Sequence, residues 1–276
     1  MAGTMRVDEY GDPNATLVAV EKRGKVAIFT LTNGRFNGYT HRMMRQLDEA
    51  IVRARFDEEV EVIVIRGAGK MFCAGADINM LQQSDPVGKY YFCLHANETL
   101  SRLEQTPKLT IAALNGHCIG GGLEIAMACD LRIAHKDAGK LGLPEINLGV
   151  LPGTGGTQRL SRVVGKSKAI ELMIKGNLFS FEEGQALDLV NEILPTAEGE
   201  DFMEKVIAYA EQFTTPNKAT MAVGHIKRAV QSGSEIPLEY GLALERELQA
   251  KLFASGDAKE GLNAYVNKTK PNFSGR

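Results

Sequence analysis

The sequence has little excess charge of either sign: 32 lysines and arginines oppose 34 aspartates and glutamates, giving a formal net charge of −2. Apolar residues make up 44% and charged residues 24%, the balance of an ordinary soluble globular protein. These values exclude a disordered chain, a fibrous repeat and a strongly basic tail for nucleic acid. The length of 276 residues allows one large domain or two small ones, and either can bury a sizeable core.

Long hydrophobic runs are also absent. No segment approaches the ~20 apolar residues that a transmembrane helix needs, and the first residues carry no apolar core of a signal peptide. The four cysteines are Cys73, Cys93, Cys118 and Cys129. None forms a Cys-x-x-Cys pair, so the usual zinc spacing is missing. We therefore expect reduced thiols, no metal, no membrane association, and a place in the cytoplasm or an organelle matrix.

Strand and helix patterns alternate through the first two-thirds of the chain. The runs 17–20 and 26–31 predict a β-hairpin, and 60–65 and 109–114 predict buried strands. Helical spacing of apolar residues occurs over 40–56, in segments up to about 105, and over 123–129. This alternation predicts an α/β fold. From about 200 to 268 the pattern is almost wholly helical, and no fixed repeat is present.

Two acidic residues lie close to glycine-rich turns. Glu124 follows the triplet 120–122 in the first turn of a predicted helix, and Glu145 follows Pro144 between two glycines. Glu124 can simply complement the helix dipole, which contributes ~0.3–1 kcal/mol, and Glu145 can be a solvated loop carboxylate. The turn 152–156 lacks the lysine of a P-loop, and 120–122 is not a dinucleotide fingerprint. Nucleoside triphosphate and nicotinamide chemistry are thereby excluded.

Two predicted strand-to-helix turns have free backbone N–H groups. One lies near Ala76, after the strand at 60–65, and the other near Gly121. If both amides converge on one oxygen, they stabilise developing negative charge by ~3–4 kcal/mol each. The alternative is that the glycines serve only tight turn geometry.

Seven strings in the chain together resemble the crotonase, or enoyl-CoA hydratase/isomerase, superfamily. They are residues 72–78, 111–116, 120–124, 144–145, 152–160, 256–261 and 270–273. The resemblance spans roughly residues 15–273 and implies a spiral of ββα units followed by C-terminal helices that pack trimers, which pair into hexamers. It divides the chain into a lead-in (1–15), an α/β core with the acyl-CoA site (16–198) and a helical trimerisation region (199–276).

The resemblance also implies the chemistry. Superfamily members bind acyl-CoA thioesters and stabilise an enolate, with an oxyanion hole that falls here on Ala76 and Gly121. In hydratases two glutamates act together, and they fall here on Glu124 and Glu145. Dienoyl isomerases carry an aspartate where this chain has Gly153. We therefore expect hydration of a 2-enoyl-CoA to a 3-hydroxyacyl-CoA, with Glu145 protonating the α-carbon and Glu124 deprotonating water.

Further positions are expected to bind substrate. The resemblance places Ala74, Asp77, Ile78 and Asn79 at the acyl-CoA site, and Arg35 near a CoA phosphate. The loop 31–40 lacks the proline usual in the family. No cofactor is implied apart from CoA as part of the substrate, and the acyl chain is left open.

Other readings remain at this stage. A crotonase-fold isomerase, or a hydratase of branched or cyclic acyl-CoA, fits the same motifs. A non-catalytic acyl-CoA-binding or RNA-binding relative is a different class. The net charge gives little drive toward nucleic acid, and one modest basic cluster is present, consisting of Arg159, Arg162, Lys166 and Lys168. These side chains are expected either to lie on a solvated helix face or to contact the phosphates of CoA. His117 and Cys118 are adjacent on a predicted strand and point to opposite faces, which argues against a thiol nucleophile.

Overall fold

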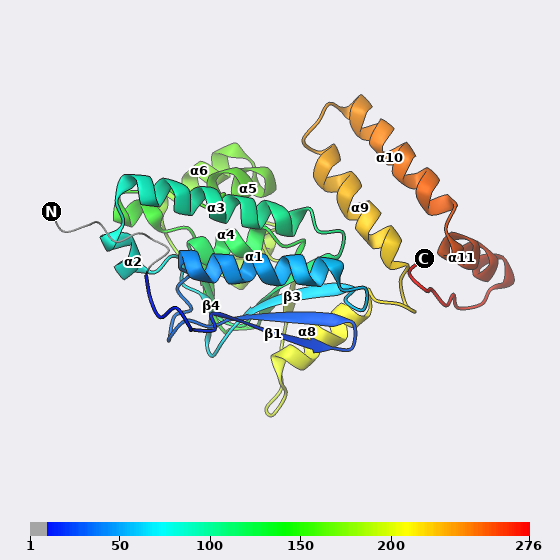
Figure 1. Cartoon of the computed structure of the whole chain (residues 1–276), viewed down its shortest axis with the longest axis horizontal. Coiled ribbons are helices and arrows are strands. Elements are labelled where there is room, and N and C mark those ends of the chain that lie inside the picture. The colour runs from blue at the N-terminus through cyan, green and yellow to red at the C-terminus, as the bar shows by residue number, and fades with distance from the viewer. Residues whose placement is uncertain (1–9) are drawn as a thin grey trace.

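Two sheets organise the computed structural model of the protein, which describes residues 10–276 (Figure 1). Most of the expected lead-in, 1–15, lies outside the described residues. The larger sheet has the order β1 (Val18–Arg23), β2 (Val26–Leu31), β3 (Val62–Gly67), β5 (Leu109–Leu114), β7 (Leu131–His135) and β10 (Glu192–Leu194). The smaller sheet has the order β4 (Met71–Cys73), β6 (His117–Ile119), β8 (Lys140–Gly142) and β9 (Phe179–Ser180). The predicted hairpin is confirmed as the antiparallel pair β1–β2, and the other strands of the larger sheet pair in parallel.

The same order of elements occurs three times along the chain: a strand of the larger sheet, a strand of the smaller sheet and a helical segment. Strands β3, β5 and β7 of the larger sheet each turn a corner into β4, β6 and β8 of the smaller one, and a helical segment follows each time. These segments are α2 (Ile78–Gln83) with α3 (Pro86–Glu104), then α4 (Gly121–Met127), then the 3₁₀ turn η2 (Glu145–Leu148) with α5 (Gly156–Val164). Because β4, β6 and β8 are parallel neighbours, the loops that leave them share one edge. This edge holds the predicted site residues.

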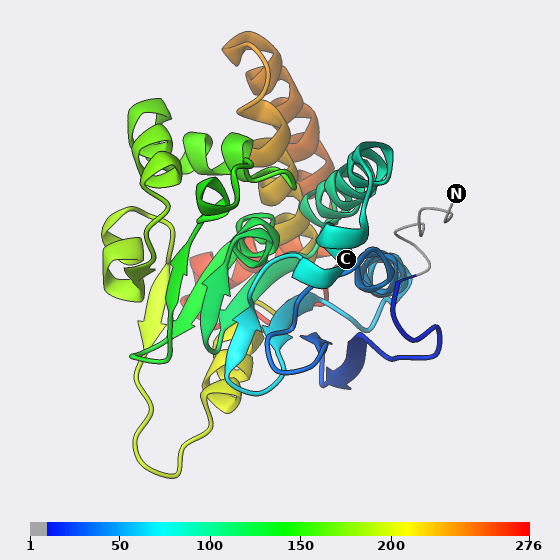
Figure 2. The same cartoon turned by 90° about the vertical axis from the view of Figure 1, so that its left-hand side faces the viewer.

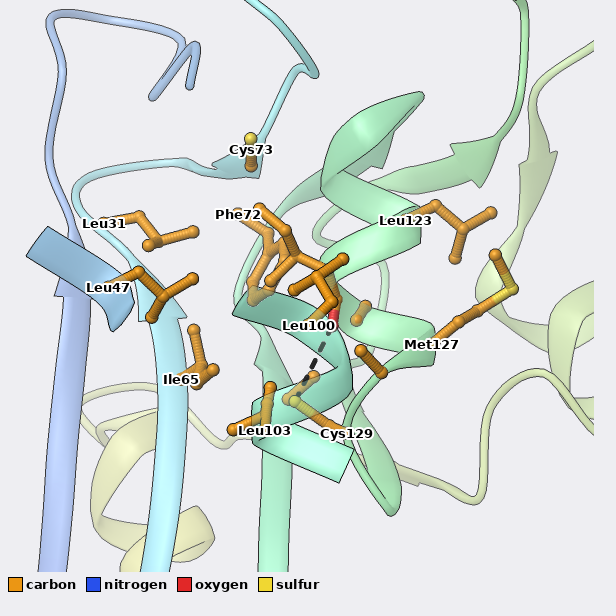
Figure 3. Close-up of a cluster of buried hydrophobic side chains, with 14 of the residues drawn as sticks. Leu31, Leu47, Ile65, Phe72, Cys73, Leu100, Leu103, Leu123, Met127 and Cys129 are labelled. Carbon is orange, nitrogen blue, oxygen red and sulfur yellow. Dashed lines mark hydrogen bonds between the residues drawn. The ribbon is translucent and has the colours of Figure 1, made fainter. Parts of the chain in front are cut away.

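The main core lies between the larger sheet and the helices α1 (His41–Phe56), α3 and α4. Figure 3 shows part of it, with Leu47 from α1, Leu100 and Leu103 from α3, and Phe72 from β4 in one cluster. The helix at 40–56 is confirmed, and Thr40 caps it by accepting a hydrogen bond from the Met43 N–H.

Cysteine side chains also contribute to this core. Cys73 and Cys129 are buried and free, and Figure 3 shows both among the apolar side chains. Burial raises the pKa of each thiol to about 12. Both therefore act as small apolar packing groups rather than as nucleophiles.

The other face of the larger sheet is covered by α8 (Phe202–Glu211), as Figure 2 shows. This helix buries Phe202, Val206 and Ala210 in one cluster with Val26 and Val62. The helices α6 (Lys166–Lys175) and α7 (Phe181–Ala186) complete the core region. The predicted helical C-terminus is present as α8, α9 (Thr220–Gly233), α10 (Leu238–Phe253) and α11 (Gly256–Asn267). Only α9–α11 project from the body in Figure 1, so α8 packs with the core although the sequence grouped it with the later helices. Within residues 10–276, no helix is long and apolar enough to cross a membrane.

Candidate active site

A cavity of about 720 Å³ opens at the shared edge of the smaller sheet. Its walls come from the loops that follow β4, β6 and β8, from Tyr39, and from the segment 81–89 that joins α2 to α3. Residues far apart in the sequence therefore meet in one concave site. The predicted residues Ala74, Ala76, Ile78, Gly121, Glu124 and Glu145 all line it.

Two residues that line the cavity, Ala76 and Gly121, have backbone N–H groups without an acceptor in the β-bridge or the helix to which they belong. The Tyr39 N–H donates to the Gly75 carbonyl (2.9 Å), and the Asp77 N–H donates to the Tyr39 carbonyl (3.0 Å). In such a parallel bridge the middle residue, Ala76, directs its own N–H away from Tyr39. Gly121 is the first residue of α4, so its N–H has no intrahelical acceptor. The structure thus brings the predicted pair Ala76 and Gly121 to the same cavity.

Glu124 is held rigidly in the first turn of α4. Its side chain belongs to a residue only 1% exposed, and its Oε1 accepts hydrogen bonds from the N–H groups of Thr154 and Gly156, each at 2.7 Å. Burial raises the pKa of this carboxyl, and the two backbone donors oppose that rise. The alternative that Glu124 only complements the helix dipole leaves these two specific hydrogen bonds unexplained.

Glu145 lies across Gly120 from the loop at 74–76. Its Oε2 is buried and has no hydrogen-bond partner among residues 10–276. Burial, with a contribution from the charge of Glu124, raises the pKa of Glu145 to about 7. A Cβ on Gly120, whose φ is +55°, would lie 2.7 Å from Glu145 Oε1, so glycine is required there. An unpartnered buried oxygen is costly, and Glu145 is one of the residues that line the cavity.

Tyr39 is a site residue that the sequence analysis missed. Its ring lies against Gly121, where a Cβ would come within 2.1 Å of Tyr39 Cε1, and it stacks on Phe92 at 5.4 Å between centroids. Its hydroxyl is 2.7 Å from Thr154 Oγ1, and the Thr154 N–H binds Glu124. Tyr39 therefore supports the Ala76 bridge, Gly121 and Glu124 together. The sequence does place Tyr39 directly before Thr40, the residue that caps α1. A tyrosine buried at such a place needs a hydrogen-bond partner for its hydroxyl, and this requirement could have drawn attention to it.

The remaining predicted substrate-binding residues do not line the cavity. Asp77 caps α2 by accepting from the Met80 N–H (3.1 Å), and it also accepts from the Tyr10 hydroxyl (3.0 Å). Asn79 is exposed on α2. Arg35 is exposed in the turn after β2, with its guanidinium 5.4 Å from the ring centroid of Phe36.

The other motifs also find places in the fold. Three members of the basic cluster form ion pairs within the chain: Arg159 with Glu104 (2.7 Å), Arg162 with Glu235 (2.6 Å) and Lys168 with Glu171 (2.6 Å). Cys118 is buried, which raises its thiol pKa well above the ordinary value, while His117 Nδ1 accepts from the Lys140 N–H. In the described part of the chain, no group of three or more His, Cys, Asp or Glu side chains is placed to hold a metal ion.

Comparison with known proteins assigns the family. The family model for enoyl-CoA hydratase/isomerase matches residues 21–276. The chain belongs to the enoyl-CoA hydratase/isomerase family. A probable enoyl-CoA hydratase of Bacillus subtilis is 38% identical over 263 residues, covering 95% of this chain and 99% of that protein. The short-chain-enoyl-CoA hydratase of Clostridium acetobutylicum is 35% identical, covering 92% of this chain and 95% of that protein.

The fold agrees with this family. A crystal structure of an enoyl-CoA hydratase from Geobacillus kaustophilus superimposes with a TM-score of 0.90 and 43% identity, covering 95% of this chain and 98% of that one. The repeated path between two sheets is thus the crotonase spiral, and the predicted fold class is confirmed.

Proposed function

We propose that this member of the crotonase superfamily is an enoyl-CoA hydratase that adds water reversibly to a 2-enoyl-CoA to give a 3-hydroxyacyl-CoA. One observation carries the proposal: two carboxylates, the buried Glu124 and the half-buried Glu145, line a cavity that Ala76 and Gly121, with their backbone amides, also line. Hydration needs a base for water, an acid for the α-carbon and donors for the enolate oxygen. These four groups supply all three.

The two carboxylates have different surroundings, which separates their roles. Glu124 accepts two backbone hydrogen bonds that stabilise its charge, so it is the base. Glu145 receives no donor at Oε2 and has a pKa of about 7, so it carries the proton. Because the two groups interact, they titrate as a pair.

The reaction then balances as follows. The thioester oxygen accepts hydrogen bonds from the Ala76 and Gly121 amides, which polarise the double bond. Glu124 takes a proton from water while the water oxygen bonds to the β-carbon. The π electrons move to the α-carbon, which takes the proton of Glu145. The pair resets when one proton passes from Glu124 back to Glu145 through water.

The test of the proposed function is the loss of enoyl-thioester absorbance with crotonyl-CoA, followed by chromatography of the products. A hydratase gives 3-hydroxybutyryl-CoA. The alternative, an isomerase, converts a 3-enoyl-CoA to its 2-enoyl form without adding water. Gly153 argues against a dienoyl isomerase, because it provides no carboxylate where those enzymes carry one. Its position is also confined, since a Cβ there would lie 3.1 Å from Cys93 Sγ.

The pH dependence of the hydration rate is expected to follow the protonation of Glu145. Its pKa of about 7 means that the proton needed for hydration is present below pH 7 and lost above it. We expect kcat/KM for crotonyl-CoA hydration to fall on the alkaline side with an apparent pKa near 7, and to fall again in acid as Glu124 is protonated. A pH–rate profile measures both limbs. A kcat/KM that rises through pH 7 to an alkaline plateau would contradict the assignment of Glu145 as the acid.

Removing the hydroxyl of Tyr39 is expected to lower activity without unfolding the protein. The Tyr39→Phe substitution keeps the ring against Gly121 but loses the hydrogen bond to Thr154, which positions Glu124. One such bond is worth ~1 kcal/mol, so kcat should fall about fivefold. Tyr91→Phe, at an exposed tyrosine of α3 that does not line the cavity, is the matched control. Equal turnover in both variants would show that Tyr39 has no positioning role.

We also propose that the protein assembles as a homotrimer or a dimer of trimers. The projecting helices carry large apolar side chains in the open, which self-association would cover. They are Ile226, Val230, Leu238, Tyr240, Leu242, Phe253, Leu262, Tyr265 and Val266. Light scattering coupled to gel filtration distinguishes a monomer from a trimer or hexamer.

A further inference from the structure

A lysine lies in the wall of the candidate active site without an assigned role. Lys89, in the second turn of α3, is half-buried and lines the cavity. Its Nζ lies 4.9 Å from the ring centroid of Phe92, which in turn stacks on Tyr39. Its charge also acts on both Glu124 and Glu145, lowering the pKa of each against the larger effect of burial. The ammonium therefore belongs to the reacting end of the cavity.

Lys89 also lacks the partner that comparable cations have. Lys227, the most buried lysine in an ion pair, lies 2.8 Å from Asp130, whereas no carboxylate among residues 10–276 forms an ion pair with Lys89. Asp85, one turn earlier on the same cavity wall, uses its Oδ1 to accept from the Gly88 N–H at 2.6 Å and so caps α3. A half-buried ammonium that lines a cavity and forms no ion pair within residues 10–276 favours a ligand that brings a negative charge.

The surroundings of Lys89 restrict what that ligand can be. Apolar side chains of the same cavity are Ile78, Leu81, Pro86, Leu148, Val150 and Leu151. They suit an acyl chain, and a charge placed among them is recognised strongly because little water screens it. The phosphates of CoA are separated from the thioester by the whole pantetheine arm. With the thioester held at Ala76 and Gly121, they lie away from the reacting end.

We propose that Lys89 binds a carboxylate at the far end of the acyl chain, so that the preferred substrates are 2-enoyl-CoA thioesters of dicarboxylic acids. This inference rests on the proposed hydratase function. The thioester oxygen is anchored at the two amides and the double bond lies between the two glutamates. The distal carboxylate then pairs with the Lys89 ammonium, which also contacts the ring of Phe92.

The test compares substrates that differ only in the terminal group. Pent-2-enedioyl-CoA is paired with pent-2-enoyl-CoA, and hex-2-enedioyl-CoA with hex-2-enoyl-CoA, and kcat/KM is measured for all four. We expect the wild-type protein to prefer the dicarboxylic member of at least one pair by tenfold or more. Lys89→Met should lower this ratio at least tenfold, and Lys89→Glu should lower it further. Lys136→Met, at an exposed lysine outside the cavity, should keep the wild-type ratio.

Each other outcome is decisive. If the wild type hydrates the monocarboxylic substrates and shows no preference in either pair, the inference is wrong while the proposed function stands. If Lys89→Met lowers kcat/KM equally for both members of a pair, Lys89 contacts the shared CoA moiety and the inference is again wrong. If none of the four substrates is hydrated, the inference and the proposed function fail together. Thermal melting of both Lys89 variants confirms that they are folded.

Discussion

Glu145→Gln is expected to lower kcat for crotonyl-CoA hydration about 10³-fold. The amide keeps the shape of the side chain but has no proton of suitable acidity for the α-carbon, and general acid catalysis contributes ~10²–10⁴-fold. Steady-state absorbance kinetics measure the loss. Glu182→Gln, at an exposed acid in the first turn of α7, should leave kcat at the wild-type value. A Glu145→Gln variant within tenfold of wild type would remove Glu145 from the mechanism.

The same substitution has a separate effect on stability. Because the folded-state pKa of Glu145 is raised to about 7 from an ordinary 4.5, folding favours its protonated form. The contribution of Glu145 to stability is therefore fully present below pH 4.5 and is lost as the pH rises through 7. Glutamine is neutral throughout, so Glu145→Gln should melt at a higher temperature than wild type at pH 8, and the difference should close near pH 4. Melting curves at both pH values show that lost activity is not lost folding.

Substitutions of Glu124 should separate catalysis from structure. Glu124→Gln retains an oxygen for the Thr154 and Gly156 amides, so it should stay folded while hydration falls about 10³-fold for lack of a base. Glu124→Ala leaves both buried N–H groups unsatisfied, and each costs ~1–3 kcal/mol. We therefore expect the alanine variant to lose several kcal/mol of stability as well as activity.

Denaturant unfolding measures the expected loss of stability in Glu124→Ala, and turnover measures the expected loss of activity in both Glu124 variants. If both variants unfold at the wild-type denaturant concentration, the hydrogen bonds to Glu124 are not structural. A Glu124→Gln variant that hydrates crotonyl-CoA at the wild-type rate would overturn its role as base. The double variant Glu124→Gln with Glu145→Gln should lose little more than either single one, because the two carboxylates act as a unit.

Much of the framework was predictable from local patterns. The strand at 109–114, the glycine triplet and the helix that starts at Gly121 each have a strong short-range signal, so Glu124 was placed correctly in a first helical turn. Ser180 and Glu183 likewise form a capping box at the start of α7, and a Ser-x-x-Glu pattern of this kind is local in the sequence. The convergence of Ala76, Gly121 and Glu145 was reached through the family motifs, because it depends on the parallel neighbours β4, β6 and β8.

Features that depend on tertiary packing had no such signal. Tyr39 joins Gly121 and Thr154 only because the chain folds residues more than 80 positions apart onto one ring. Lys89 has the sequence appearance of an ordinary helix-surface lysine, and only the structure shows that it lines the cavity. Conversely, Asp77 looked like a substrate contact, yet its carboxylate caps α2. The position of Asp77 at the end of a glycine-rich loop is compatible with both substrate contact and helix capping, so the sequence could not distinguish the two roles.

The most direct test of the account is the mass of the acyl-CoA recovered after incubating the purified protein with crotonyl-CoA in water enriched in oxygen-18. Addition of water by the Glu124–Glu145 pair predicts a product heavier by one labelled water, formed rapidly by the wild type and almost not at all by Glu145→Gln. The same incubation is repeated with shorter- and longer-chain 2-enoyl-CoA thioesters. If crotonyl-CoA and all of these homologues are recovered at unchanged mass, hydration is not the function of this site.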